Sequence, residues 1–275
     1  MTDILTKYEP ITLAEMKGIR LMNRTDTKFV TTTERLKELF AMARAAYRAQ
    51  EIDGRRVARY YTVYFDTEEC DMFHVHQCGV LNRQKLRIRS YVDSGLNFLE
   101  IKTKNNHRRT KKQRVSVDDF DPLSPRYDVI STNADDANHN EYVDFVNSHL
   151  RYGADMLTPQ LENRFNRITL VNNNKTERLT IDTDLRFHNL TTGKDMSFDG
   201  IAIIELKRDG LVYSPIVDML LDLRIKPMGF SKYCMGSAFT NDTLRHNRFI
   251  ERMHTVGKLM GDEHRDIAVS RYAIY

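Results

Sequence analysis

The 275-residue sequence has few of the features that would assign it to several common classes of protein. Its three cysteines, Cys70, Cys78 and Cys234, form no framework of paired spacings, so we expect reduced thiols in a reducing compartment. No apolar run approaches the roughly 20 residues of a membrane-spanning helix. The opening residues, MTDILTKYEP, have neither the basic nor the apolar region of a secretory signal. We therefore expect a soluble, cytoplasmic protein without a transmembrane segment of its own.

Two further features that the sequence lacks, a P-loop motif and a large net charge, reduce the number of possible functions. The sequence has no glycine-rich loop followed by Lys and Ser or Thr, so a P-loop nucleotide site is unsupported. The formal net charge is only +4, which excludes a strongly basic nucleic-acid coat protein. The positive charge is concentrated in one segment instead: between Arg83 and Arg114 there are eleven Lys or Arg residues and two acidic residues.

Hydrophobic spacing predicts an α+β protein with two groups of strands. We expect strands over residues 24–30, 58–67, 80–92, 97–104 and 111–117, and again over 163–171, 178–189 and 200–208. Helices are expected over 9–20, 34–49 (ending near Asp53-Gly54), 141–150, 214–223 and 243–260. No linker is long enough to require two domains, so residues 1–275 are expected to form a single domain.

The basic strands carry their charge on one face. Side chains alternate along a strand, so Arg87 and Arg89 share a face with Arg83 and Lys85, while Leu86 and Ile88 lie opposite. By the same parity Glu100 joins Lys102, opposite Leu99 and Ile101. Like charges repel by about 4 kcal/mol at ~4 Å for an effective dielectric near 20, so an outward sheet face normally mixes signs.

A closed sheet explains such a face better than a solvated one. Strands with one charged face can form a barrel whose polar face lines the lumen. A cationic lumen with a few carboxylates suits a polyphosphate chain and a divalent metal, because Arg binds phosphate oxygens bidentately and carboxylates hold Mg²⁺ or Mn²⁺.

Seven ordered pieces carry a family resemblance: RQKLRIRSY, FLEIKTK, KKQR, FNR, RLTIDTDL, IIELK and FSKYCMG. In this order, over residues 24–239, the chain resembles the catalytic domain of the vacuolar transporter chaperone (VTC) family. Those domains are polyphosphate polymerases of the triphosphate tunnel metalloenzyme (CYTH-like) superfamily. The resemblance implies an antiparallel β-barrel tunnel of about eight strands with helices packed outside. It also implies a metal-dependent ATP–polyphosphate phosphotransferase that uses Mn²⁺ or Mg²⁺.

The resemblance also implies a role for individual residues. Catalytic positions would be Lys28, Arg87, Arg89, Lys102, Arg178 and Lys207. Substrate-binding positions would be Lys112, Arg114, Arg167 and Lys232, where the choice between Lys112 and Arg114 as the residue facing the tunnel is open. Glu205 and Glu100 would bind the metal. The first strand departs from the superfamily's E-x-E-x-K pattern, since it reads Arg24-x-Asp26-x-Lys28. This weakens the expectation of a metal at that edge and makes Glu205 the stronger candidate.

The implied reaction needs no nucleophilic side chain. The terminal phosphate of a growing chain would attack the γ-phosphorus of ATP, and Lys, Arg and metal would position and neutralise the phosphates. With water as the attacking group, the same site would hydrolyse tripolyphosphate or a nucleoside triphosphate. A third possibility is a non-catalytic module that binds polyphosphate, inositol phosphates or RNA. The expected partners are ATP and polyphosphate, with a membrane protein as a further possible partner.

Two other sequence patterns are weaker evidence of function. Cys70-x3-His74-x-His76-x-Cys78 contains four metal-ligand residues, but its spacing is not that of a common zinc finger or ribbon, and we expect His74 and His76 to share a strand face near the sheet edge. The run HRRTKKQR, residues 107–114, could contact RNA or serve as a nuclear signal. We favour the tip of a basic hairpin, so nucleic acid is not the expected partner.

Overall fold

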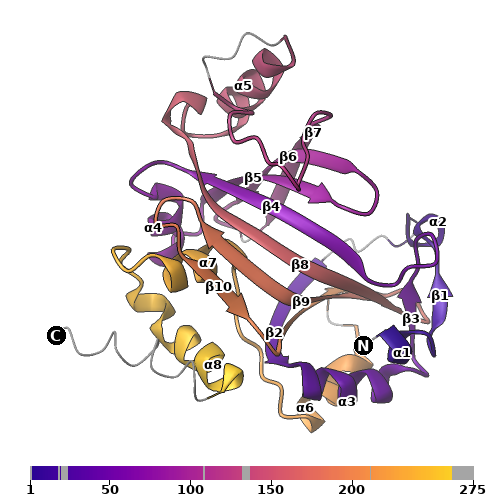
Figure 1. Cartoon of the computed structure of the whole chain (residues 1–275). Coiled ribbons are helices and arrows are strands. Elements are labelled where there is room, and N and C mark those ends of the chain that lie inside the picture. Colours follow the sequence, from indigo (N-terminus) through magenta and orange to yellow (C-terminus); the bar gives the residue numbers. More distant parts are fainter. Residues whose placement is uncertain are drawn as a thin grey trace.

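The structure, a computed structural model, describes residues 2–17, 19, 24–107, 109–131, 137–210 and 212–261 (Figure 1). The strands are β1 (Glu9–Ile11), β2 (Arg24–Thr32), β3 (Tyr47–Gln50), β4 (Ala58–Asp66), β5 (Arg83–Tyr91), β6 (Leu96–Lys104), β7 (Thr110–Ser116), β8 (Thr158–Asn172), β9 (Glu177–Asn189), β10 (Asp195–Phe198) and β11 (Ile201–Asp209). The helices are α1 (Thr2–Leu5), α2 (Leu13–Lys17), α3 (Thr33–Ala43), α4 (Asp71–Gln77), α5 (Ala137–His149), α6 (Pro215–Asp222), α7 (Lys232–Thr240) and α8 (Ile250–Met260).

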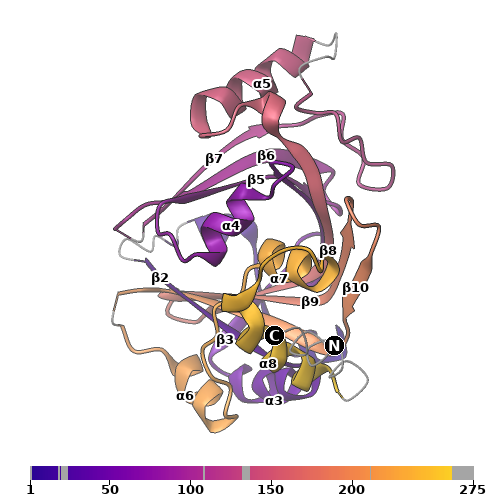
Figure 2. The same cartoon turned by 90° about the vertical axis from the view of Figure 1, so that its left-hand side faces the viewer.

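One curled sheet organises the fold. Eight strands follow the order β2-β11-β9-β8-β4-β5-β6-β7, and each neighbouring pair is antiparallel. β10 pairs antiparallel with β9, while β3 pairs antiparallel with β8 and in parallel with β1. The sheet wraps around α7, as Figure 2 shows. The prediction of a curled, antiparallel, tunnel-like sheet of eight strands with outer helices is therefore confirmed. No ladder joins β2 to β7 within the described chain, so the sheet is not closed.

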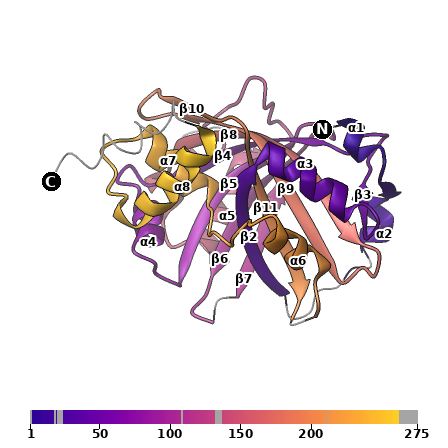
Figure 3. The same cartoon turned by 90° about the horizontal axis from the view of Figure 1, so that it is seen from below.

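Two apolar layers cover the convex face of the sheet. One contains Leu36, Phe40 and Ile216 and packs α3 and α6 against the sheet (Figure 3). The other packs Val146 of α5 against the outward side chains of β5 and β6, which are Leu86, Ile88, Leu99 and Ile101. These four residues are fully buried, as the strand alternation predicts.

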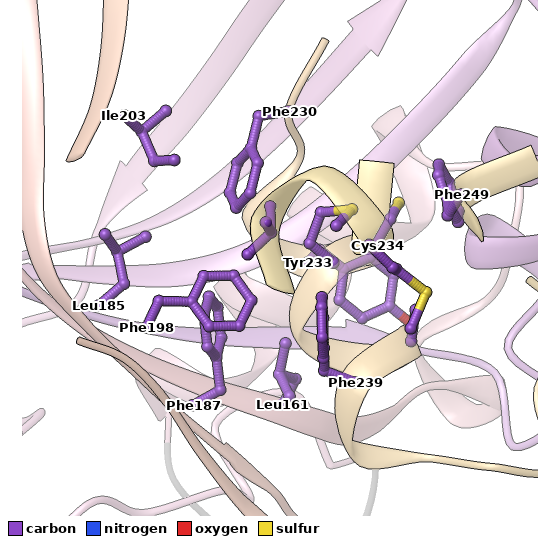
Figure 4. Packing of buried hydrophobic residues seen from close by; sticks show 14 of the residues in the cluster. Leu161, Leu185, Phe187, Phe198, Ile203, Phe230, Tyr233, Cys234, Phe239 and Phe249 are labelled. Atoms are coloured by element: carbon purple, nitrogen blue, oxygen red, sulfur yellow. The ribbon is translucent and has the colours of Figure 1, made fainter. Parts of the chain in front are cut away.

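A third apolar layer lies inside the curl, where α7 packs against β8 and β9 (Figure 4). Gly236 of α7 allows this close approach, because a Cβ at that position would lie 2.4 Å from Phe187 and 2.7 Å from Leu161. The layer also contains Phe198 and Tyr233. This layer covers part of the concave face, and the rest of that face carries charged side chains.

Several expected elements differ from the structure. One helix is expected over residues 9–20, but Glu9–Ile11 is a strand and the described helix is Leu13–Lys17, while residues 18 and 20 lie outside the described residues. The helix expected over 34–49 ends at Ala43, because Tyr47 enters β3 and its hydroxyl binds the buried Glu177 carboxylate. The last helix begins at Ile250, after a short 3-10 turn, rather than at residue 243.

The segment around His74 and His76 is helical, so the expectation that they share a strand face is wrong. The carboxylate of Asp66 explains the helix, because its oxygens accept the backbone N–H groups of Met72 and Phe73, both at 2.9 Å. A carboxylate that accepts the first free N–H groups of a helix stabilises its N-terminus. α7 and β10 were not expected at all.

Candidate anion-binding site

The concave face of β5, β6 and β7 carries two rows of charged side chains. Strand register places Lys85, Lys102 and Lys112 directly opposite one another across the three strands. The next row consists of Arg87, Glu100 and Arg114. Directly opposite residues lie on the same face of a sheet, so Lys112 and Arg114 both face the concave side. The sequence leaves open which of the two residues faces the tunnel, and the structure places both on the concave face.

The opposite wall, formed by β8, β9, β11 and β2, continues the pattern. Arg167 is opposite Asp182. The following row contains Thr180, Glu205 and Lys28. The last row contains Arg178, Lys207 and Asp26. Ten candidate cations from sequence therefore lie on one concave face or beside it: Lys28, Arg87, Arg89, Lys102, Lys112, Arg114, Arg167, Arg178, Lys207 and, at the start of α7, Lys232.

Three of the carboxylates on this face, Glu100, Asp182 and Glu205, lie next to cations. Glu100 is buried and accepts Arg87 Nη2 at 2.7 Å, and Lys112 forms a second ion pair with it. Burial alone would raise the pKa of Glu100, but Arg87, Arg89 and Lys112 outweigh it and lower the pKa to about 2. The carboxylate is therefore ionised at neutral pH, and most of its charge is already neutralised.

Asp182 is paired even more closely. Arg167 donates to it bidentately, with Nε–Oδ1 and Nη2–Oδ2 distances of 2.6 and 2.8 Å, and Lys232 forms a further ion pair. Burial opposes ionisation of Asp182, yet the two cations hold its pKa well below the usual range. Sequence analysis did not identify this residue as part of the site, although its parity with Arg178 on β9 was a usable signal.

Glu205 has the loosest pairing of the three. Its carboxylate lies 3.7 Å from Lys207 Nζ and is less buried than those of Glu100 and Asp182. Burial would raise its pKa, but Lys28, Lys207 and Lys102 lower it to about 2. Glu205 is thus an ionised carboxylate with coordination capacity left for another cation.

Several polar groups on the concave face have no protein partner. The Lys102 side chain forms no hydrogen bond or ion pair with the residues that the structure describes. Arg89 Nε, Thr62 Oγ1 and Thr180 Oγ1 are buried and accept or donate no hydrogen bond within the described residues. Buried polar atoms are rarely left unsatisfied in folded proteins. These groups therefore indicate a face that binds a polar ligand or ordered water.

The turn that begins α7 connects both walls of the concave face. Lys28 Nζ donates to the Phe230 carbonyl at 2.7 Å, and Lys85 Nζ donates to Ser231 Oγ at 2.5 Å. Lys232 binds Asp182 from the same turn. Sequence analysis placed Lys85 on the charged face but did not include it in the site, and nothing in the local sequence could have revealed its contact with Ser231.

A second set of contacts anchors this turn. Tyr233 Oη donates to Asp66 Oδ2 at 2.6 Å. The Cys234 thiol lies 3.0 Å from His76 Nδ1. Cys70 is buried and Cys78 is exposed, and no group of three His, Cys, Asp or Glu side chains among the described residues is arranged to hold a metal. Among the described residues, His76 therefore packs against Cys234 of α7, and the cysteine and histidine pattern at residues 70–78 shows no metal-binding arrangement.

The same geometry limits how a divalent metal could bind. Of Glu100, Asp182 and Glu205, the first two are occupied by cations, which leaves Glu205 as the one of the three with capacity for Mn²⁺ or Mg²⁺. Mg²⁺ is commonly held by one or two carboxylates together with substrate phosphates and water. The residues present fit an ion of that kind, and they do not offer an all-protein cage.

The lysines of the site predict a pH dependence. Burial is the main cause that lowers the pKa of Lys232 to about 7 and those of Lys207 and Lys85 to about 8. These ammonium groups are charged below their pKa and lose their charge as pH rises through it. The affinity for tripolyphosphate should therefore fall by roughly tenfold or more between about pH 6.5 and about pH 9.

Calorimetric titration with tripolyphosphate at constant ionic strength would measure this fall. The ligand does not lose negative charge as pH rises, so weaker binding must come from the protein. An affinity that is constant or increases over this range would show that these lysines do not contact the anion.

Comparison with known proteins identifies one family. Residues 23–241 match the family model described as the VTC domain, which is most of the chain. A comparison with curated proteins finds no match.

Two solved structures are similar at low identity. A proposed adenylate cyclase from Bacillus halodurans is 12% identical, with 76% of this chain and 96% of that chain covered and a TM-score of 0.46. A proposed adenylyl cyclase from Hippeastrum, described as having a dominant triphosphatase activity, is 14% identical, with 82% and 100% covered and a TM-score of 0.45. The family assignment rests on the domain match.

Proposed function

The chain belongs to the VTC domain family, and from this premise we propose that it is a polyphosphate polymerase that transfers the γ-phosphate of ATP onto a growing polyphosphate chain. One observation supports the proposal most strongly. The concave face gathers cations from seven strands, and its buried Arg89, Thr62 and Thr180 side chains have atoms without hydrogen-bond partners among the described residues. A chain of phosphates supplies both the negative charge and the acceptors that such a face requires.

The proposed reaction is an in-line displacement on phosphorus. A terminal phosphate oxygen of the chain forms a bond to the γ-phosphorus of ATP, the bond to the β–γ bridging oxygen breaks, and ADP leaves with that electron pair. Lys28, Arg87, Arg89, Lys102, Arg178 and Lys207 are proposed to neutralise charge at the reacting phosphates. Lys112, Arg114, Arg167 and Lys232 are proposed to bind the rest of the chain. Positioning and electrostatic stabilisation supply the catalysis.

A divalent metal would be held by Glu205 together with phosphate oxygens of the substrate. Bound there, Mn²⁺ or Mg²⁺ would neutralise negative charge on the phosphates. Glu100 is the second candidate ligand, but its ion pairs with Arg87 and Lys112 favour a different role. We propose that Glu100 orients these two cations toward the substrate.

The site could also hydrolyse a triphosphate. Lys102 and Arg114 are exposed to water, so a water molecule could reach the phosphates in place of the acceptor chain. The cations would serve hydrolysis of tripolyphosphate or a nucleoside triphosphate equally well.

The proposed setting follows from the proposed reaction. None of the helices in the described part of the chain has the length and apolar character that crossing a membrane requires. We propose that the protein acts in the cytoplasm, where ATP is available, and that a membrane partner could accept the product. Nucleic acid is not a proposed partner.

Product analysis tests the proposal. The full-length protein would be incubated with ATP and Mn²⁺, with a parallel sample in EDTA, and the products resolved on a gel stained for condensed phosphate. We expect metal-dependent chains together with ADP. Free phosphate without chains would replace the polymerase with a hydrolase. If ATP is not consumed although tripolyphosphate binds, the protein is a binding module.

A further inference from the structure

Four aromatic side chains form a continuous band across the concave face. Phe165 of β8 is opposite Tyr60 of β4, which is opposite Tyr91 of β5, and Phe98 of β6 lies next to Tyr91. The ring centroids of successive pairs are 5.1, 5.0 and 5.9 Å apart. The band therefore crosses four neighbouring strands on the face that otherwise carries the cations.

The outer half of this band does not serve the hydrophobic core. Phe165 and Tyr60 pack against the apolar layer around α7, whereas Tyr91 and Phe98 belong to none of the apolar clusters of the described residues. Both are only partly buried. Leu96, which is opposite Tyr91 in the register, is 53% exposed. Core packing accounts for the inner two rings and leaves Tyr91 and Phe98 unexplained.

Arginine side chains adjoin these rings. The guanidinium carbon of Arg114 lies 4.2 Å from the Phe98 ring centroid. Phe98 is also directly opposite Arg89 in the strand register, and the buried Arg89 Nε has no partner among the described residues. The Phe98 ring, the Arg114 guanidinium plane and Arg89, which is proposed to bind phosphate, therefore lie in the same row or in adjacent rows of the sheet.

We propose that Tyr91 and Phe98, with Arg114 packed on the Phe98 ring, form a stacking platform for the base of a nucleoside triphosphate whose phosphates lie along the cationic rows. The inference rests on the proposed function, because it requires triphosphate in the concave face. Nucleobases stack on aromatic rings and on arginine planes through contacts that every base can make. The platform would therefore distinguish a nucleoside triphosphate from inorganic tripolyphosphate, with little preference among the bases.

Substitution of the rings tests the platform. In the Phe98→Leu and Tyr91→Leu variants, ATP affinity should fall by roughly tenfold, whereas tripolyphosphate affinity should stay within about twofold of wild type. Phe145→Leu is the matched control, because Phe145 lies on α5 against the convex face, and it should change neither affinity. Calorimetry would measure the affinities, and thermal melting would verify folding.

A second measurement uses the wild-type protein alone. Ribose 5-triphosphate, which has no base, should bind more weakly than ATP by the same factor that the variants lose. GTP and CTP should bind within a few-fold of ATP.

The outcomes separate the two proposals. If wild type binds both ATP and tripolyphosphate, but the variants lose both affinities equally or neither, the platform is wrong and the proposed function stands. Equal binding of ribose 5-triphosphate and ATP would also overturn the platform. If wild type binds neither ligand, the proposed function fails, and the platform fails with it.

Discussion

Replacing Arg87 and Arg89 together with alanine should abolish the consumption of triphosphate. Both guanidinium groups project from β5 onto the concave face, one paired with Glu100 and the other buried with an unpartnered Nε among the described residues. Removal of one preorganised donor to a developing charge commonly costs roughly 10²–10³-fold in rate. The double variant should therefore lose at least about 10³-fold in turnover of ATP, measured as ADP release.

The control replaces two basic residues outside the sheet. Arg35 and Lys37 are exposed on α3, so the Arg35→Ala, Lys37→Ala variant removes the same formal charge away from the concave face and should keep wild-type turnover. Arg87 also balances the buried Glu100, so thermal melting is needed to show that the test variant is folded. Turnover that survives in a folded Arg87→Ala, Arg89→Ala protein would show that the site is elsewhere.

The Glu205→Gln variant should lose metal-dependent turnover but keep anion binding. Of Glu100, Asp182 and Glu205, Glu205 has the weakest pairing, 3.7 Å from Lys207 Nζ. The amide preserves shape and removes the charge that attracts a divalent cation. We expect turnover to fall by roughly 10²-fold or more at saturating Mn²⁺.

The affinity of the Glu205→Gln variant for tripolyphosphate should not fall with its turnover. Without metal, tripolyphosphate should bind Glu205→Gln at least as tightly as wild type, because one negative charge is gone from a cationic face. Glu38→Gln on the exposed side of α3 is the matched control and should behave as wild type. If Glu205→Gln shows an unchanged Mn²⁺ dependence, Glu205 does not hold the metal.

Strand alternation predicted the concave face well, because it depends only on local geometry. Leu86 and Ile88 are buried in the outer core and Arg87 faces inward, as the period of two requires. The helix at Pro215–Asp222 was likewise visible from its Ser214-Pro215 start. Where the alternation or the helix signal was strong, the sequence was sufficient to predict both the element and its buried side.

Partners that come from distant segments could not be predicted. α7 is buried on all sides, so the sequence of Lys232–Thr240 lacks the alternation of apolar and polar residues from which an amphipathic helix is predicted. The contact of Lys232 with Asp182 spans 50 residues of sequence. The residues of β6 that lie opposite Lys112 and Arg114 depend on the register between β6 and β7. The lack of a ladder between β2 and β7 among the described residues depends on the curvature of the whole sheet.

Calorimetric titration of the wild-type protein with tripolyphosphate, near pH 7 and without metal, tests the central claim most directly. A single site of cations predicts saturable binding of one anion per chain, which weakens steeply as salt is added because several charges are neutralised together. The Arg87→Ala, Arg89→Ala variant should lose this binding, and the Arg35→Ala, Lys37→Ala variant should keep it. If the wild-type protein shows no saturable binding, or if both variants bind equally, the concave face is not a triphosphate site.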